Sequence, residues 1–223
     1  MSRRPSVVLL VVAIAAGLGL LASRQTGFWP TSARPAPSKP PALQALTLLP
    51  QPRAIPDFSL RQSDGTALDR ADLAGHWTLV FLGFTHCPDI CPTTLAQLAQ
   101  AQKAWESIPT GTRPRLLFVS VDPQRDTPQR AGAYASGFHP ETLAATGNVA
   151  ALQAFARSLS LVFMDVPAAT GEHAQHGAQP PSVDHSAALA VLDPQSRMAG
   201  VITAPLRPQA IADDLRALAL HAP

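Results

Sequence analysis

Residues 78–84 (TLVFLGF) form an uninterrupted apolar run, which is typical of a strand buried inside a sheet. Shortly after this run, Pro92 opens a segment that reaches about residue 107 and repeats its apolar side chains at helical spacing. Since a strand that is apolar on both faces needs helices to cover it, these two segments together predict an α/β domain.

The other segments favour the same fold class. Two short stretches flank the turn signal Ser63-Asp64-Gly65 and predict a hairpin. Because strands and helices alternate in the centre of the chain, we expect a mainly parallel core sheet with flanking helices, closed by an antiparallel hairpin and a C-terminal helix. The expected strands are residues 57–60, 66–68, 116–121, 161–166, 187–192 and 198–203, and the further expected helices are residues 127–136, 148–159 and 208–218.

The charges are unevenly distributed along the chain. Five cations and no acid occur before residue 50, whereas from residue 51 onward 12 Lys and Arg face 15 Asp and Glu. This mildly acidic part contains no cluster of Lys and Arg, which argues against nucleic-acid binding. The hydrophobic content of the whole chain is 46%, which is enough for a sizeable core.

The N-terminal pattern predicts a membrane segment. Residues 7–22 are continuously apolar, with Arg3 and Arg4 before them and Arg24 after them. We expect a retained transmembrane helix, and a cleaved signal peptide is the alternative, although the small-residue cleavage pattern is poor here. Both interpretations carry the rest of the chain across the membrane, because the positive end of such a segment stays inside.

The chain therefore divides into three expected parts. Residues 1–24 are the membrane anchor or signal peptide. Residues 25–53 are rich in proline, which favours extended geometry and predicts a semi-stiff linker. Residues 54–223 are the expected folded domain, because the alternation of strand and helix patterns begins there.

Both cysteines lie in one segment, Cys87-Pro88-Asp89-Ile90-Cys91, between the buried strand and the helix. A helix start favours anions, so we expect a thiol at this place to have a lowered pKa. Residues four apart share one face of a helix, so the two sulfurs can bind one ion, and thiolates favour Cu(I) and Zn. Two cysteines cannot build an all-sulfur zinc site, whereas two sulfurs and one imidazole suit Cu(I). A structural disulfide is the alternative, but a loop this short gains little stability from one.

The segment at residues 81–95 (FLGFTHCPDICPTTL) is very similar to the signature of the Sco/SenC family. The similarity continues, in the same order, through residues 119–128, 137–140 and 183–186, and it covers about residues 54–220. Several separated motifs in the right order make a chance similarity improbable.

This resemblance implies a thioredoxin-like fold that binds one copper ion per chain, as Cu(I) and also as Cu(II), through Cys87, Cys91 and His185. It also implies a copper chaperone that delivers copper to, or helps to mature, the dinuclear copper site of cytochrome c oxidase subunit II. The expected location is the bacterial inner membrane, with a single transmembrane helix and the domain facing the periplasm.

Five other side chains are candidate accessory residues. Asp184 could orient the ring of the neighbouring histidine, as outer-shell carboxylates do in metal sites. Asp89 and Asp122 could tune the thiols or touch a partner, and both could equally be caps or turn formers. His173 and His176 could capture Cu(II) before hand-over, or belong to a polar loop without such a role.

Other functions remain open at this point. A thiol–disulfide oxidoreductase could use a Cys87–Cys91 disulfide, which would also block metal entry, although thioredoxin-type sites have the shorter C-x-x-C spacing. A peroxiredoxin-type peroxidase is disfavoured, because its threonine precedes the reactive cysteine by three residues, whereas Thr85 precedes Cys87 by two. The sequence does not separate a copper or redox sensor from a chaperone.

Overall fold

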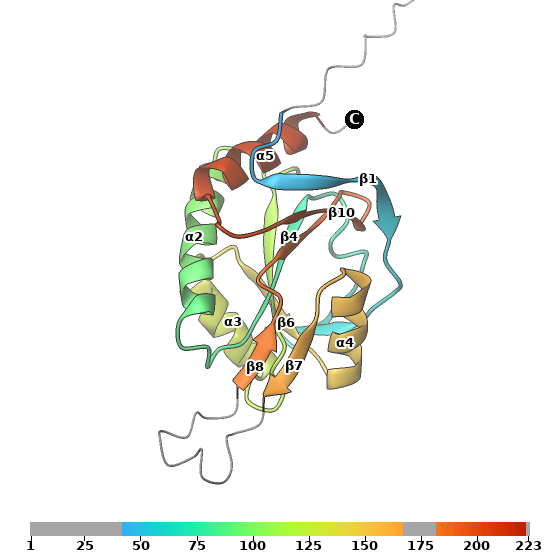
Figure 1. The fold of residues 1–223 in the computed structure, drawn as a ribbon, viewed down its shortest axis with the longest axis vertical. Coiled ribbons are helices and arrows are strands. Elements are labelled where there is room, and N and C mark those ends of the chain that lie inside the picture. The colour runs from blue at the N-terminus through green and yellow to red at the C-terminus, as the bar shows by residue number, and fades with distance from the viewer. Residues whose placement is uncertain (1–41, 167–181, 222–223) are drawn as a thin grey trace, which may run out of the picture. The chain divides into compact units, whose positions relative to one another are not determined.

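A mixed eight-stranded sheet forms the centre of the computed structural model, which describes residues 42–166 and 182–221 (Figure 1). The strand order is β1-β10-β9-β4-β5-β6-β2-β3. The three middle strands β4, β5 and β6 are parallel, and every other pairing in this sheet is antiparallel. The middle of the sheet is therefore parallel, as the sequence pattern predicts, whereas the sheet as a whole is mixed. The strands are β1 Leu46–Ala54, β2 Leu60–Gln62, β3 Ala67–Leu68, β4 Thr78–Gly83, β5 Arg115–Ser120, β6 Leu143–Thr146, β9 Leu189–Leu192 and β10 Arg197–Ile202.

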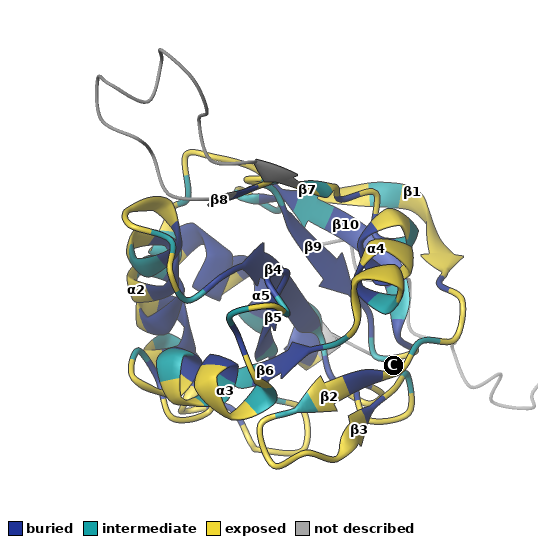
Figure 2. Cartoon of the chain, turned by 90° about the horizontal axis from the view of Figure 1, so that it is seen from below, coloured by how far each residue is buried: buried dark blue, intermediate teal, exposed yellow. Residues whose placement is uncertain are grey.

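Four described helices cover the sheet: α2 Ile90–Trp105, α3 Pro128–Ser136, α4 Val149–Ser158 and α5 Pro208–His221. Each lies where the sequence predicts one. The hydroxyl of Thr127 and the side chain of Asn148 cap α3 and α4 as expected. Helices α2 and α5 pack against each other, and the Trp105 indole donates to the Ala212 carbonyl at 3.2 Å. Helix α4 lies across the sheet from α2 (Figures 1 and 2).

Strand β4 lies at the centre of the core, and all six of its residues are buried (Figure 2). It pairs in parallel with β5 and antiparallel with β9, so its position is fixed from both sides. The continuous apolar run at residues 78–84 reflects this double burial, as expected for a central strand.

The expected strand at residues 161–166 forms, but it does not join the core sheet. Strand β7 (Phe163–Val166) leaves the main sheet and pairs only with β8 (Ser182–His185), in a separate two-stranded sheet. Val162 and Met164 are 61% and 63% exposed, so their apolar character does not reflect burial. The core strand in this part of the chain is β6, whose sequence LAAT has weak strand propensity and gave no signal.

Strand β1 covers residues 46–53, which the proline content assigns to the linker. It is an edge strand, and its register with β10 shifts between Leu48 and Arg53, around Pro50 and Pro52. A residue without an N–H is tolerated at such an edge or bulge. The predicted membrane segment lies outside the described residues, and none of the helices within 42–166 and 182–221 has the length and apolarity to cross a membrane.

The carboxylate of Asp214 fixes the start of β1 to helix α5. It is 3% exposed and accepts three backbone N–H groups, from Gln44, Ala45 and Leu46, at 2.7 to 3.0 Å. A buried carboxylate that accepts several N–H groups forms strong, charge-assisted hydrogen bonds.

We expect Asp214→Asn to lower the free energy of unfolding of the reduced chain by about 1–3 kcal/mol, because a neutral amide oxygen is a weaker acceptor than the carboxylate and the amide nitrogen cannot accept the Gln44 N–H that also reaches Oδ1. Urea unfolding followed by circular dichroism measures this change. A stability equal to that of the unsubstituted chain would show that the Asp214 hydrogen bonds contribute nothing net.

Candidate metal centre

The two cysteines lie at the end of β4 and the start of α2, as the sequence predicts. Cys91 is in the first turn of α2 and is fully buried, whereas Cys87 lies in the preceding loop and is half-buried. The Cys91 backbone N–H donates to the Cys87 sulfur at 3.2 Å, so the helix start faces that sulfur directly. Both thiols are free.

His185 reaches the same place from a distant part of the chain. It ends β8, opposite Phe163 of β7, and its ring meets Phe81 and Phe84 edge-on at centroid distances of 5.9 and 6.2 Å. In Figure 1, β8 lies beside the loop that leads into α2. The aromatic contacts leave the ring little freedom to turn.

The hydrogen bonds of His185 fix which ring nitrogen is free. Nδ1 lies 3.1 Å from the Ser186 carbonyl oxygen, which can only accept, so Nδ1 carries the proton. Nε2 is then the nitrogen with the lone pair, and it lies 3.4 Å from the Cys91 sulfur. The Cys91 S–H therefore donates a hydrogen bond to Nε2. A metal ion at this place would bind the same two atoms.

The three donor atoms of Cys87, Cys91 and His185 lie within 4.8 Å of one another. With the bond lengths of about 2.3 Å to sulfur and 2.0 Å to nitrogen that zinc shows, an ion bound to two atoms 3.4 Å apart would make an angle of about 105°. This angle lies in the normal range, so the Cys91–His185 pair could hold an ion with little movement.

The protonation of the buried donors follows from their surroundings. Burial lowers the pKa of His185 despite the opposing effects of the Ser186 carbonyl and the Asp184 charge, so the ring is neutral at pH 7. Burial also raises the pKa of the Cys91 thiol, and the hydrogen bond with Cys87 raises it further. The expectation of a lowered thiol pKa is thus wrong for Cys91, because desolvation outweighs the effect of the helix start.

The candidate accessory residues take varied positions. Asp184 is exposed, and the Ser186 carbonyl, not Asp184, holds Nδ1 of the histidine ring. Asp122 is buried and forms an ion pair with Arg125. Asp89 is exposed at the N-cap of α2 and makes no side-chain capping bond. His173 and His176 lie outside the described residues.

Three residues near the site had no role in the sequence-based hypothesis. Gly83 leaves room for the Cys91 sulfur, and Asp126 is a buried carboxylate beneath the cysteine loop. Tyr134 packs between Phe118 and Phe138, and burial together with the nearby thiols raises its pKa to about 12. Only a weak signal for them is present in the sequence, because a glycine in a strand or an acid in a turn is common in places that have no functional role.

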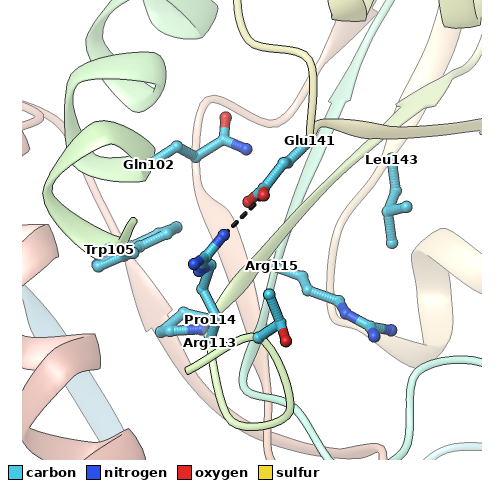
Figure 3. Close-up of a pocket in the computed structure, with 8 residues that line it drawn as sticks. Gln102, Trp105, Arg113, Pro114, Arg115, Glu141 and Leu143 are labelled. Atoms are coloured by element: carbon cyan, nitrogen blue, oxygen red, sulfur yellow. Dashed lines mark hydrogen bonds and ion pairs between the residues drawn. The ribbon is translucent and has the colours of Figure 1, made fainter. Parts of the chain in front are cut away.

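A cavity of about 340 Å³ lies away from the cysteine and histidine donors, between α2, β5 and β6 (Figure 3). Its two arginines already have partners. Arg113 donates to Glu141 at 2.6 Å and to the carbonyls of Glu106 and Ile108, and Arg115 donates to the Asp72 carbonyl. The Arg113 charge is therefore already paired with the Glu141 carboxylate.

We expect Gly83→Ala to disturb both the core and the site. The added Cβ would lie 2.8 Å from Phe118 and 3.1 Å from the Cys91 sulfur. Overpacking of this kind costs about 1–3 kcal/mol of unfolding free energy, measurable by urea unfolding. The matched control is Gly111→Ala, where no atom lies within 4 Å of the new Cβ. Equal stability of the two variants would refute the steric assignment.

We also expect an alkylating reagent to modify Cys87 well before Cys91 in the reduced, metal-free chain. Cys87 is half-buried, whereas Cys91 is inaccessible and remains protonated at neutral pH, and the thiolate is the reactive form. Digestion and mass spectrometry at successive times give the two rates. Faster modification of Cys91 would contradict the described burial.

The chain matches the family model SCO1/SenC over residues 47–220. It is 36% identical over 162 residues to a Stutzerimonas stutzeri protein whose name provisionally assigns it copper binding, covering 72% of this chain and 74% of that protein. It is also 36% identical over 139 residues to the mitochondrial SCO1 homolog 1 of Arabidopsis thaliana, which covers 62% of this chain but 39% of that protein.

Two solved structures have the same fold. Arabidopsis thaliana ScoI with copper bound is 30% identical, with a TM-score of 0.63, and the match covers 75% of this chain and all of that one. BsSco, described as a member of the Sco family of cytochrome c oxidase assembly proteins, matches with a TM-score of 0.59 over 78% of this chain and 98% of that one. At 19% identity this second match shows the fold alone. With its α/β thioredoxin-like architecture and a family match across residues 47–220, the chain belongs to the SCO1/SenC family.

Proposed function

We propose that this chain binds one copper ion through Cys87, Cys91 and His185 and acts as a copper chaperone. The observation that carries the proposal is the convergence of two sulfurs and one neutral imidazole nitrogen within 4.8 Å. Thiolate and imidazole ligands suit Cu(I). The copper-bound structures of Sco proteins from Arabidopsis thaliana and Bradyrhizobium japonicum support copper as the metal.

The composition of the site argues against a structural zinc ion. Structural zinc sites have four protein ligands, whereas the described residues bring three candidate donors together here. An ion bound by three donors keeps a position open to an incoming ligand. Since Cys87 is half-buried, a partner's thiol can approach the ion from that side and take it by ligand exchange.

The surface near the site suits a protein partner. Ile90, between the two cysteines, is 57% exposed, and Val162, just before β7, and Met164, within it, are exposed as well. Exposed apolar side chains that gather in one region are typical of interaction surfaces.

The proposed partner is cytochrome c oxidase, with the dinuclear copper site of subunit II as the recipient. This assignment rests on the resemblance of the sequence motifs to the Sco/SenC family and on the family match across residues 47–220. The proposed location is a bacterial inner membrane, with residues 1–24 as the anchor and the domain in the periplasm, because the charges around residues 7–22 favour that orientation.

A thiol–disulfide oxidoreductase is the second candidate function. Both thiols are free, and their sulfurs lie within 4.8 Å, so a small movement would bring them to the 2.05 Å of a disulfide. Such a disulfide removes two of the three donors, which makes redox state a switch for copper binding rather than an unrelated activity.

We expect the reduced chain to bind one equivalent of Cu(I) in competition with a chelator, with zinc as the comparison metal. Cys87→Ser and Cys91→Ser should weaken binding by more than the ~100-fold that loss of an outer-shell partner can cost, because each removes a ligand. His185→Ala should weaken it and change the spectrum of the Cu(II) form. Oxidation to the Cys87–Cys91 disulfide should abolish binding.

Unchanged affinity and spectrum in His185→Ala would remove His185 from the ligand set. A reduced chain that takes up no copper, yet reduces partner disulfides at rates comparable with a true thioredoxin, would reverse the order of the two candidate functions.

A further inference from the structure

A buried carboxylate lies directly beneath the cysteine loop. Asp126 is 1% exposed and accepts the Thr85 backbone N–H at 2.8 Å, the Thr85 hydroxyl at 2.5 Å and the Ser120 hydroxyl at 2.5 Å. Its other near neighbour is Nδ1 of His86, at 3.5 Å. A carboxylate that is removed from water needs such donors, and here it has three of them from two different segments.

These contacts join parts of the chain that are distant in sequence. Thr85 and His86 immediately precede Cys87, and Ser120 is the last residue of β5. Asp126 itself is fixed by its backbone N–H, which donates to the Asp122 carbonyl at 2.9 Å, just before the start of α3. The carboxylate therefore ties the loop after β4 to the loop after β5.

These hydrogen bonds of Asp126 determine the backbone conformation that leads into Cys87. The Cys87 N–H closes a turn onto the Phe84 carbonyl at 3.3 Å, and Thr85 lies inside this turn. Because both the N–H and the hydroxyl of Thr85 bind one carboxylate, the turn cannot rotate without breaking two hydrogen bonds.

The same contacts explain the place of His86. Its Nδ1 lies 3.2 Å from the Thr85 hydroxyl and 3.5 Å from Asp126, so the ring faces the carboxylate. His86 adjoins Cys87 in sequence, yet it does not join the group of donors that converge within 4.8 Å. The carboxylate thus holds an adjacent imidazole away from the donor set.

We propose that Asp126 is the positioning residue of the metal centre, which sets the place of the Cys87 sulfur relative to Cys91 and His185. This inference rests on the proposed copper site. It goes beyond that site in giving a role to a residue that binds no metal and lies 39 positions after Cys87 in the chain.

The test compares Asp126→Asn with Asp214→Asn in the reduced full chain. Both substitutions replace a buried carboxylate that accepts three hydrogen bonds, but Asp214 lies on α5 and fixes the start of β1. Thr85→Val is the milder variant, because it removes one hydroxyl and keeps the backbone hydrogen bond to Asp126. Thermal unfolding curves identify a temperature at which all the variants are folded, and the measurements are made at that temperature.

Two readouts at that temperature separate positioning from stability. Asp126→Asn should weaken Cu(I) binding by about tenfold or more, as loss of an outer-shell partner does, and change the sulfur-to-Cu(II) absorption band. It should also lower by several-fold the equilibrium constant for forming the Cys87–Cys91 disulfide by exchange with a glutathione redox buffer, in which oxidised glutathione is reduced to two thiols, because the sulfurs are less well aligned. Thr85→Val should change both readouts in the same direction by less, and Asp214→Asn should change neither by more than twofold.

Copper affinity, spectrum and disulfide equilibrium in Asp126→Asn that all match those of Asp214→Asn would overturn the proposal. If Asp126→Asn does not fold, Thr85→Val decides, and values equal to those of the unsubstituted chain count against positioning. If the unsubstituted chain binds no copper, the proposed function fails, while the disulfide equilibrium still tests Asp126 without any metal.

Discussion

The pairing of β4 with β5 on one side and β9 on the other is the constraint on which the rest of the molecule depends. Because β4 is parallel to β5, the loops that follow both strands leave the sheet at the same edge. Because β9 is antiparallel to β4, the first residue of β9 lies at that edge too. His185, the last residue of β8, comes only a few residues before β9 in the chain. The topology therefore brings residues 87 and 185 together before any metal binds.

The contact between the Cys91 sulfur and His185 Nε2 shows how the metal-free site stays ordered. Cys91 is fully buried and His185 is half-buried, and a polar atom removed from water without a partner would cost free energy. In the reduced chain the hydrogen bond from the Cys91 thiol to Nε2 supplies that partner, and a metal ion held by Cys91 and His185 would take the place of the thiol proton. The high pKa of Cys91 and the low pKa of His185 both follow from the same desolvation, which favours the neutral pair until an ion arrives.

The parts of this arrangement that were predictable from the sequence are those with local signals. The run at residues 78–84, the caps at Thr127 and Asn148, and the C-x-x-x-C segment each act over a few residues. His185 came from a family resemblance, since nothing in its own neighbourhood marks a ligand.

The parts that sequence patterns missed depend on distant contacts. The structural role of Asp126 depends on its hydrogen bonds with Thr85, 41 positions away in the sequence. A glycine is needed at position 83 because Phe118 and the Cys91 sulfur leave no room for a Cβ. Strand β6 was missed because alanine is a weak strand former, and β7 was placed wrongly because exposed apolar residues resemble buried ones in a sequence. Likewise, the raised pKa of Cys91 arises from burial, which the motif alone does not show.

X-ray absorption at the copper edge of the reduced, copper-loaded chain tests the central claim most directly, because it counts the ligand atoms around the ion. The account predicts two sulfur neighbours at about 2.3 Å and one imidazole nitrogen at about 2.0 Å, close to the lengths such ligands show with zinc. The nitrogen contribution should disappear in His185→Ala. A copper ion with no imidazole neighbour in the unsubstituted chain, or with oxygen and nitrogen neighbours alone, would contradict the account.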